Sequence, residues 1–145
     1  MLRDVTVRQA EDGDRAFLLD TYLAVMRPYV EWAWGWDEGF QRVGFWRSLR
    51  VADFKLVLVN SLRAGGICVR HEPGERTLQM LILAPEFQRQ GVGSLLAAAE
   101  VEAARSSDER LKLWVIKNNP AKRMYERLGF VTVGEDDVRY LMHVA

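Results

Sequence analysis

The stretch Gln88-Arg89-Gln90-Gly91-Val92-Gly93 has the composition of a phosphate-binding loop. It follows an apolar segment that ends at Ala84–Pro85 and precedes an alanine- and leucine-rich segment with strong helix propensity. Gly91 and Gly93 allow a close approach of the backbone, and free N–H groups of the loop and first helical turn would point together at an anion. The spacing predicts a cradle for phosphate or pyrophosphate; the alternative is an ordinary loop and helix cap.

The same loop lacks two common nucleotide-binding patterns. It contains no Gly-Lys-Ser/Thr sequence, which argues against a nucleoside-triphosphate P-loop, and no G-x-G-x-x-G of a dinucleotide-binding fold.

The two histidines, His71 and His143, have no metal-ligand neighbour at motif spacing, so no metal site is predicted.

The elements that must position this loop are strands and helices in a mixed order. Alternating or continuous apolar runs predict strands at 2–8, 54–60, 64–71, 77–84, 111–116, 130–134 and 138–144. Helical spacing predicts helices at 16–28, where Pro28 marks the end, and at 38–50, 94–107 and 120–129. The order β-α-α-β-β-β-α-β-α-β-β predicts an α+β fold with a mixed, mostly antiparallel sheet and flanking helices. The strand–helix–strand unit at 77–116 predicts a parallel pair with a right-handed crossover.

Composition narrows the class of protein. A length of 145 residues predicts one domain, residues 1–145. Twenty basic and 20 acidic residues balance to a net charge of zero, which argues against nucleic-acid binding. No apolar run approaches the roughly 18 residues that a membrane helix needs, so no membrane partner is expected. Cys68 is the single cysteine, which excludes an intrachain disulfide and favours a cytoplasmic setting.

A second pattern gives the loop its context. The residues from Asn118 to Phe130 match N-x-x-A-x-x-x-Y-E-x-x-G-F without a gap, and Gln88 to Gly93 match Q/R-x-x-G-x-G/A. By these two motifs, in this order, the sequence resembles the GNAT N-acetyltransferase superfamily. The order of predicted elements is also the family's, so the resemblance covers essentially the whole chain.

The resemblance implies that acetyl-CoA is the acetyl-donor cosubstrate. Its pyrophosphate would bind the backbone N–H groups of the loop, and its pantetheine arm would pair with the strand edge at Leu83–Ala84. A backbone N–H near Leu83 would polarise the thioester carbonyl. Asn118 would bond the pantetheine arm, and Lys122 would meet a phosphate. The implied loop residues are Gln88, Arg89, Gln90, Gly91, Val92, Gly93 and Ser94.

Proton transfer needs an acid and a base. The resemblance implies that Tyr125 is the general acid that protonates the CoA thiolate, since a phenol with a pKa of about 10 can donate at neutral pH. The structural alternative is that Tyr125 belongs to an apolar stripe of its helix. Many family members place a glutamate base on the central strand, where this chain has Gln79, which cannot act as a base. Glu38 is the candidate replacement; a carboxylate elsewhere, a water chain or absent catalysis are the alternatives.

The stretch "YVEWAWGWDE", residues 29–38, is expected in the loop region between the first two helices. The resemblance implies an acceptor pocket built largely from these two helices, the loop between them and the late strands. Tyr29, Trp32 and Trp36 are therefore predicted to contact the acceptor, because an aromatic wall suits an ammonium group. The alternative is that Trp32 and Trp36 fix a helix end to the sheet. By their patterns, Trp46 and Trp114 are expected in the core.

The leading hypothesis is direct acetyl transfer from acetyl-CoA to a primary amine of a small molecule or peptide. The second hypothesis is a non-catalytic acyl-CoA-binding or regulatory domain, which is supported by Gln79 at the position where a catalytic base is expected. The third hypothesis is an aromatic-rich module in which the tryptophans contact a partner protein. Carboxylates near the tryptophans mildly favour a cationic small acceptor. Homodimers are common on this fold, and a homodimer is left open.

Overall fold

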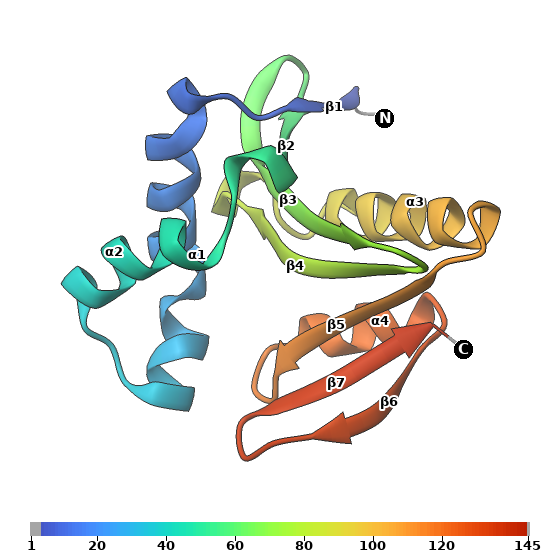
Figure 1. Cartoon of the computed structure of the whole chain (residues 1–145). Helices are drawn as coiled ribbons and strands as arrows, with labels where there is room; N and C mark the ends of the chain where they lie inside the picture. Colours follow the sequence, from blue (N-terminus) through green and yellow to red (C-terminus); the bar gives the residue numbers. More distant parts are fainter. Residues whose placement is uncertain (1–3, 145) are drawn as a thin grey trace.

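A computed structural model describes residues 4–144, which form one seven-stranded sheet with helices on both faces (Figure 1). The strand order across the sheet is β1-β2-β3-β4-β5-β7-β6. All neighbouring strands are antiparallel except β4 and β5, which are parallel, so the predicted α+β class and element order are confirmed. The strands are β1 (Val5–Gln9), β2 (Phe54–Val59), β3 (Leu62–Glu72), β4 (Glu75–Leu83), β5 (Arg110–Ile116), β6 (Phe130–Glu135) and β7 (Arg139–Val144).

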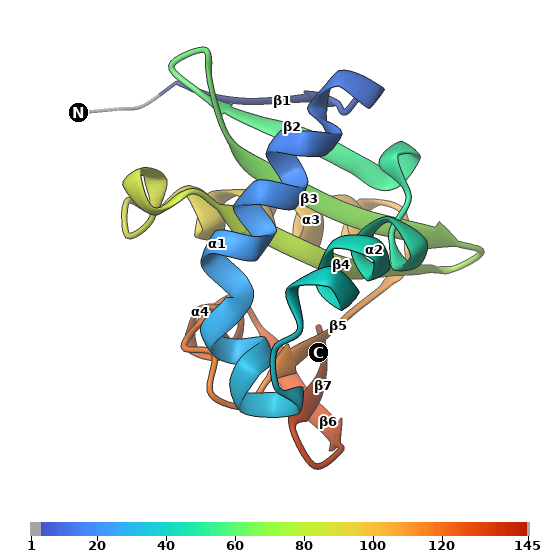
Figure 2. The same cartoon turned by 90° about the vertical axis from the view of Figure 1, so that its left-hand side faces the viewer.

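Four α-helices cover the sheet, two on each face (Figures 1 and 2). They are α1 (Arg15–Trp34), α2 (Glu38–Ser48), α3 (Val92–Ser106) and α4 (Ala121–Arg127), and three single 3-10 turns lie at Asp12–Asp14, Val51–Asp53 and Pro85–Phe87. Leu18 of α1 and Phe45 of α2 are buried in a core with Phe54 on one face. Leu96 of α3 and Tyr125 of α4 are buried with Leu113 on the other. Within residues 4–144, no helix is long and apolar enough to cross a membrane.

The central strands β4 and β5 separate along their length. Their parallel pairing covers only Glu75–Leu78 opposite Arg110–Leu113, although β4 continues to Leu83 and β5 to Ile116. The crossover between them is α3, as the strand–helix–strand pattern predicts. Beyond Leu78 the facing edges of β4 and β5 lack the hydrogen bonds of a continuous sheet, and this split positions the candidate site.

Helix α1 does not end at Pro28, as the sequence predicts, but continues to Trp34 and stops before Gly35. Proline in a helix interior costs about 3 kcal/mol through a lost hydrogen bond and a steric clash. Here the segment after the proline is held by packing, because Val30 is buried in the core and Ala33 packs against it. Tertiary contacts therefore outweigh the local preference, and Trp32 and Trp34 belong to the helix rather than to a loop.

The remaining boundaries agree with the prediction to within a few residues. The first strand begins at Val5; residues 2 and 3 of its predicted range lie outside the described residues. The β3–β4 register shifts between Cys68 and Val69, where Gln79 is the extra residue on β4. Past this bulge β4 runs on to Leu83, the last residue before the split edge meets the glycine loop.

Candidate active site

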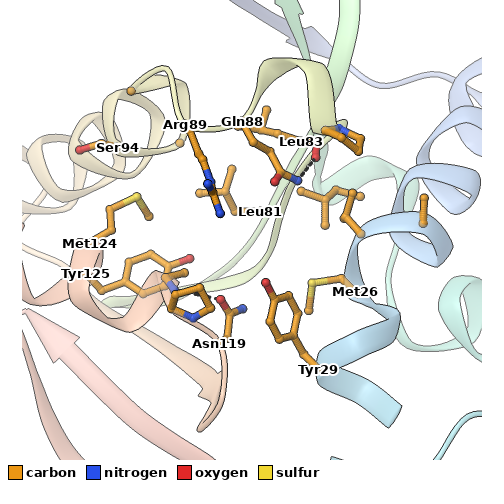
Figure 3. A pocket seen from close by; sticks show the side chains of 18 of the residues that line it. Met26, Tyr29, Leu81, Leu83, Gln88, Arg89, Ser94, Asn119, Met124 and Tyr125 are labelled. Atoms are coloured by element: carbon orange, nitrogen blue, oxygen red, sulfur yellow. Dashed lines mark hydrogen bonds between the residues drawn. The ribbon is translucent and has the colours of Figure 1, made fainter. Parts of the chain in front are cut away.

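A cavity of about 670 Å³ lies where β4 leaves β5. Its walls are α1, the last residues of β4, the loop that enters α3, and the start and inner face of α4 (Figure 3). Tyr125 of α4 and Tyr29 of α1 stand on opposite walls, and Arg89 of the loop points between them (Figure 3).

The edge of β4 presents free backbone groups to this cavity. The N–H of Ala84 donates to the carbonyl of Ala64, on the β3 side, over 2.8 Å. Since consecutive residues of a strand point their N–H groups to opposite sides, those of Leu81 and Leu83 point toward β5. No β5 residue pairs with them, because the β4–β5 ladder stops at Leu78. The edge can therefore bind an extended chain or polarise a carbonyl.

The loop before α3 forms a polar end of the cavity. Gly91 is the N-cap of α3 with a φ of 82°, in the left-handed region that favours glycine, and no side chain caps this helix. The first-turn N–H groups thus keep their capacity to bind an anion, with the positive end of the helix dipole behind them. A β-carbon added to Gly93 would lie in ordinary van der Waals contact with Met124, Leu83 and Leu81, at 3.7 to 4.0 Å, so a side chain there would start among residues that line the cavity.

Tyr125 is the buried proton-carrying group of the cavity. It is 8% exposed, and its ring meets Phe130 edge-on at 5.5 Å between centroids. Burial raises the pKa of Tyr125 to about 12, because the phenolate would lose its solvation. The phenol therefore stays protonated at neutral pH and can give a proton to a departing thiolate.

The cavity brings together most of the residues that the glycine-loop motif predicts. Backbone or side-chain atoms of six of them line it: Leu83, Gln88, Arg89, Gly91, Gly93 and Ser94. Ala84, Gln90 and Val92 are not among the lining residues; Val92 is buried in the core, and Gln90 bonds the carbonyl of Glu86.

Two residues that were predicted from the second motif to contact the cofactor do not line the cavity. Asn118 is exposed in the turn after β5, and its neighbour Asn119 lines the cavity instead. The side chain of Asn119 accepts a 2.9 Å hydrogen bond from the N–H of Ala121 at the start of α4, which fixes its position. Lys122 points elsewhere, because its ammonium lies 4.8 Å above the ring of Tyr140 and pairs with Glu126 at 3.2 Å. The basic residue of α4 that lines the cavity is Arg127.

Glu38, the candidate base, does not line the cavity. It is the first residue of α2, its side chain is half exposed, and it pairs with Arg42 at 3.4 Å. Gln79 sits at the β4 bulge and accepts a hydrogen bond of 3.4 Å from the Cys68 thiol. Among the described residues that line the cavity, none is aspartate, glutamate or histidine.

The tryptophans divide into packing and surface residues, and Tyr29 alone of the predicted acceptor contacts lines the cavity. Trp36 packs against the core, with the Arg27 guanidinium 5.3 Å above its ring. Trp32 is 53% exposed on α1. Trp114, predicted in the core, is instead 42% exposed.

One face of the partly exposed Trp114 ring packs against an arginine of the chain itself. Arg139 lies 4.3 Å above the ring of Trp114 and 5.8 Å from that of Trp34. Asp136 holds this arginine with hydrogen bonds of 2.9 and 2.7 Å. Trp34, Trp36 and Trp114 each have an arginine of the chain within 6 Å of the ring centroid, and none of the three lines the cavity. Trp46 packs against the core as predicted, edge-on to Phe45 at 4.7 Å.

Sequence reasoning missed one entire wall, the middle of α1. Ala24, Val25 and Met26 line the cavity beside Tyr29. These three residues were not predicted, because Pro28 was interpreted as the end of the helix and the pocket was expected at the residues that follow it. The only available signal was the apolar spacing from Leu23 to Val30, which runs through the proline.

Comparisons with known proteins identify the architecture. A family model described as an acetyltransferase (GNAT) domain matches residues 40–132, more than half of the chain. The PaiA N-acetyltransferase of Thermoplasma acidophilum, solved with coenzyme A, has 18% identity and a TM-score of 0.71, covering 97% of this chain and 98% of that one. An N-acetyltransferase from Staphylococcus aureus has 14% identity and a TM-score of 0.74, covering 96% and 100%.

A third structure has a bisubstrate ligand. Naa50 of Arabidopsis thaliana, in complex with the analogue CoA-Ac-MVNAL, has 17% identity and a TM-score of 0.70, covering 97% of this chain and 98% of that one. No protein of curated function matches the sequence. The matched residues 40–132 include both motifs and the split between β4 and β5. The chain belongs to the acetyltransferase (GNAT) family.

Proposed function

We propose that residues 1–145 form one N-acetyltransferase domain that moves the acetyl group of acetyl-CoA to a primary amine of a small molecule or peptide. The observation that carries this proposal is the split edge of β4, where free N–H groups lie between the glycine loop and Tyr125. The loop would hold the pyrophosphate, and the edge at Leu81 and Leu83 would hold the pantetheine arm.

The chemistry is a direct attack. The amine lone pair forms a C–N bond to the thioester carbon, and the carbonyl oxygen gains the negative charge, which a β4 N–H stabilises. The C–S bond then breaks, and Tyr125 gives its proton to the sulfur. The proton lost by the nitrogen replaces the one that Tyr125 gave, so an amine and a thioester become an amide and a thiol. The single cysteine, Cys68, takes no part in this route, because it is buried and burial raises its pKa to about 12.

A second candidate is an acyl-CoA-binding domain without catalysis. It is favoured by one observation: the described lining residues of the cavity include no carboxylate or imidazole to act as a base. Such a protein would bind acetyl-CoA with the same loop and turn over no amine.

We also propose that the protein works in the cytoplasm. The buried free thiol of Cys68 supports this proposal, because thiols stay reduced there.

Calorimetric titration with acetyl-CoA tests the binding site, with Gly93→Glu as the variant. The new carboxylate would enter the cradle, while a glutamate in the first turn of α3 suits the helix dipole, so the fold should hold. Gly44→Glu in α2 is the matched control, since a side chain there meets nothing within 4 Å. We expect the wild type and Gly44→Glu to bind and Gly93→Glu not to. Equal binding by all three would contradict the assignment of the cradle.

A further inference from the structure

The side chain of Asn119 is held in one orientation at the start of α4. Its Oδ1 atom accepts a 2.9 Å hydrogen bond from the backbone N–H of Ala121. Only the oxygen of an amide side chain can accept such a bond, so the Nδ2 group occupies the other position. This contact fixes both the direction of the side chain and the end of it that is left for a ligand.

The free end of this amide is an accessible donor. Nδ2 carries two N–H groups and has no hydrogen-bond partner within residues 4–144. In the same range, Nε1 of Trp36 is the one buried side-chain nitrogen or oxygen without a partner, so Nδ2 of the half-buried Asn119 is open to solvent. The residue lines the cavity, and its amide lies between the rings of Tyr125 and Tyr29 (Figure 3).

The other side-chain donors of the lining are engaged or lie elsewhere. Apart from the two tyrosines, they are Gln88, Arg89, Ser94 and Arg127. The amide of Gln88 donates to the carbonyl of Leu83, and the next two belong to the glycine loop. Arg127 is the last residue of α4, at the opposite end of this helix from Asn119. Among the described lining residues, Asn119 is thus the neutral amide donor left for the reacting group.

The neighbours of this donor indicate which ligand atom it would meet. Tyr125 is proposed to give its proton to the sulfur, so the thioester would lie beside this hydroxyl. The carbonyl carbon is bonded directly to that sulfur, and its oxygen would therefore be close to a donor next to Tyr125. From the other side of the split, β4 offers the N–H groups of Leu81 and Leu83. The thioester oxygen would lie between a backbone donor and Asn119.

We propose that Asn119 is a catalytic residue whose Nδ2–H group stabilises the negative charge on the thioester oxygen during acetyl transfer. The inference rests on the proposed function and adds a side-chain donor to the backbone N–H of β4. As the amine nitrogen bonds to the carbonyl carbon, one electron pair of the C=O bond moves to the oxygen, which Asn119 stabilises. When the C–S bond breaks, this pair returns to the carbonyl, and Asn119 keeps its protons.

This role differs from the one that the resemblance implies for the adjacent residue. Asn118 was expected to bond the pantetheine arm, but it is exposed and does not line the cavity. A bond to the pantetheine arm is equally strong before and during the reaction, so its loss weakens binding. A bond to the thioester oxygen strengthens as the charge develops, so its loss lowers kcat.

Asn119→Ser is the first test, because it removes the Nδ2 donor without adding charge. The serine hydroxyl retains an oxygen that can accept the Ala121 N–H bond. With a peptide amide or a polyamine as acceptor, we expect kcat to fall about 100- to 1000-fold, the usual effect of one lost oxyanion donor. The acetyl-CoA Kd should stay within about threefold. Asn118→Ser, the same change one residue away, is the matched control and should keep kcat and Kd.

Infrared difference spectroscopy provides a second readout that needs no turnover. The probe is acetyl-CoA labelled with ¹³C at the thioester carbonyl, because a hydrogen bond to a carbonyl oxygen weakens the C=O bond and lowers its stretching frequency. We expect the bound carbonyl band at a lower frequency in the wild type and Asn118→Ser than in Asn119→Ser.

The outcomes separate this inference from the proposed function. An Asn119→Ser enzyme whose kcat or carbonyl band matches that of Asn118→Ser would overturn the role of Asn119 and leave the transferase proposal standing. A raised acetyl-CoA Kd with unchanged kcat would assign Asn119 to the pantetheine arm and would also overturn it. Wild-type binding of acetyl-CoA without turnover of any amine would instead refute the transferase proposal and, with it, the catalytic role of Asn119.

Discussion

The side-chain amide of Gln88 donates a 2.8 Å hydrogen bond to the main-chain carbonyl of Leu83. This bond ties the glycine loop to the split edge of β4, the two parts of the site that we propose to bind acetyl-CoA. It also shows that the Leu83 carbonyl faces the cavity and not β3. The loop is thereby held at a fixed distance from the strand edge.

Removal of this tie should weaken cosubstrate binding. We expect Gln88→Ala to raise the acetyl-CoA Kd about 2- to 10-fold, because one neutral, exposed hydrogen bond contributes about 0.5–1.5 kcal/mol. Gln90→Ala is the control, since it removes an equally long bond, to the carbonyl of Glu86, from a residue that does not line the cavity. Calorimetry on both variants decides: equal Kd values would mean that the Gln88–Leu83 bond does not support the site.

The hydroxyl of Tyr125 should matter for turnover and little for binding. We expect Tyr125→Phe to lower kcat by about 100-fold or more, the usual contribution of a positioned acid, and to leave the acetyl-CoA Kd within about threefold. The phenyl ring keeps its contact with Phe130, so unfolding by urea should be nearly unchanged. An unaltered kcat would return Tyr125 to a purely structural role.

The raised pKa of Tyr125 also predicts the shape of the pH profile. The acid works only when protonated, and its pKa of about 12 keeps it protonated throughout the neutral and mildly alkaline range. Activity should therefore rise with pH as the acceptor loses its proton and should not fall again below about pH 11 for want of this acid. A descending limb centred near pH 8–9 that disappears in Tyr125→Phe would contradict the assignment.

Asp14 should stabilise the 3-10 turn at Asp12–Asp14, which connects β1 to α1. Its buried carboxylate accepts hydrogen bonds of 2.8 and 3.1 Å from Arg8 and one of 2.9 Å from the N–H of Glu11. We expect Asp14→Ala to lower the free energy of unfolding by about 1–3 kcal/mol, at the lower end because Arg8 is partly exposed. Asp12→Ala, which removes a carboxylate that is 89% exposed, should change it little.

The pH dependence of this contribution has a definite sign. The hydrogen bond from Arg8 holds the pKa of Asp14 below its usual value of 3.8. The stabilisation is therefore complete above about pH 4 and is lost as the pH falls through the lower, folded-state value. Urea unfolding at pH 7 and at pH 3 should show a smaller difference between wild type and Asp14→Ala at pH 3. A difference that grew in acid would contradict this account.

Much of the fold could be predicted from the sequence, because each strand and helix has a strong local pattern. The apolar runs and turn residues in 54–84 and the predicted start of a helix after Gly93, two residues beyond its observed start at Val92, led to the correct order of elements. These signals depend on residues that are near neighbours in the chain. For the same reason Gly91, Gly93 and Tyr125 could be assigned to one site through their motifs before their contacts were known.

The errors arose where distant contacts override a local rule. Pro28 lies inside α1 because the helix beyond it is packed on the core. Trp114 is 42% exposed although it lies on the central strand β5, and its strand pattern alone does not show this. Asn119 lines the cavity in place of Asn118, and its side-chain amide accepts a hydrogen bond from the start of α4. The spacing of the motif does not show which of these two adjacent asparagines takes that position. Glu38, the candidate base, lies outside the cavity lining and pairs with Arg42 on α2, a position that its place in the sequence could not reveal.

A crystal structure of the protein with CoA would test the central claim most directly. Our account predicts the pyrophosphate on the N–H groups of the loop at Gly91 and Gly93, and the pantetheine arm along Leu81 and Leu83. The sulfur should then lie next to the hydroxyl of Tyr125. CoA bound elsewhere, or with its sulfur on the far side of β4 from Tyr125, would contradict the account.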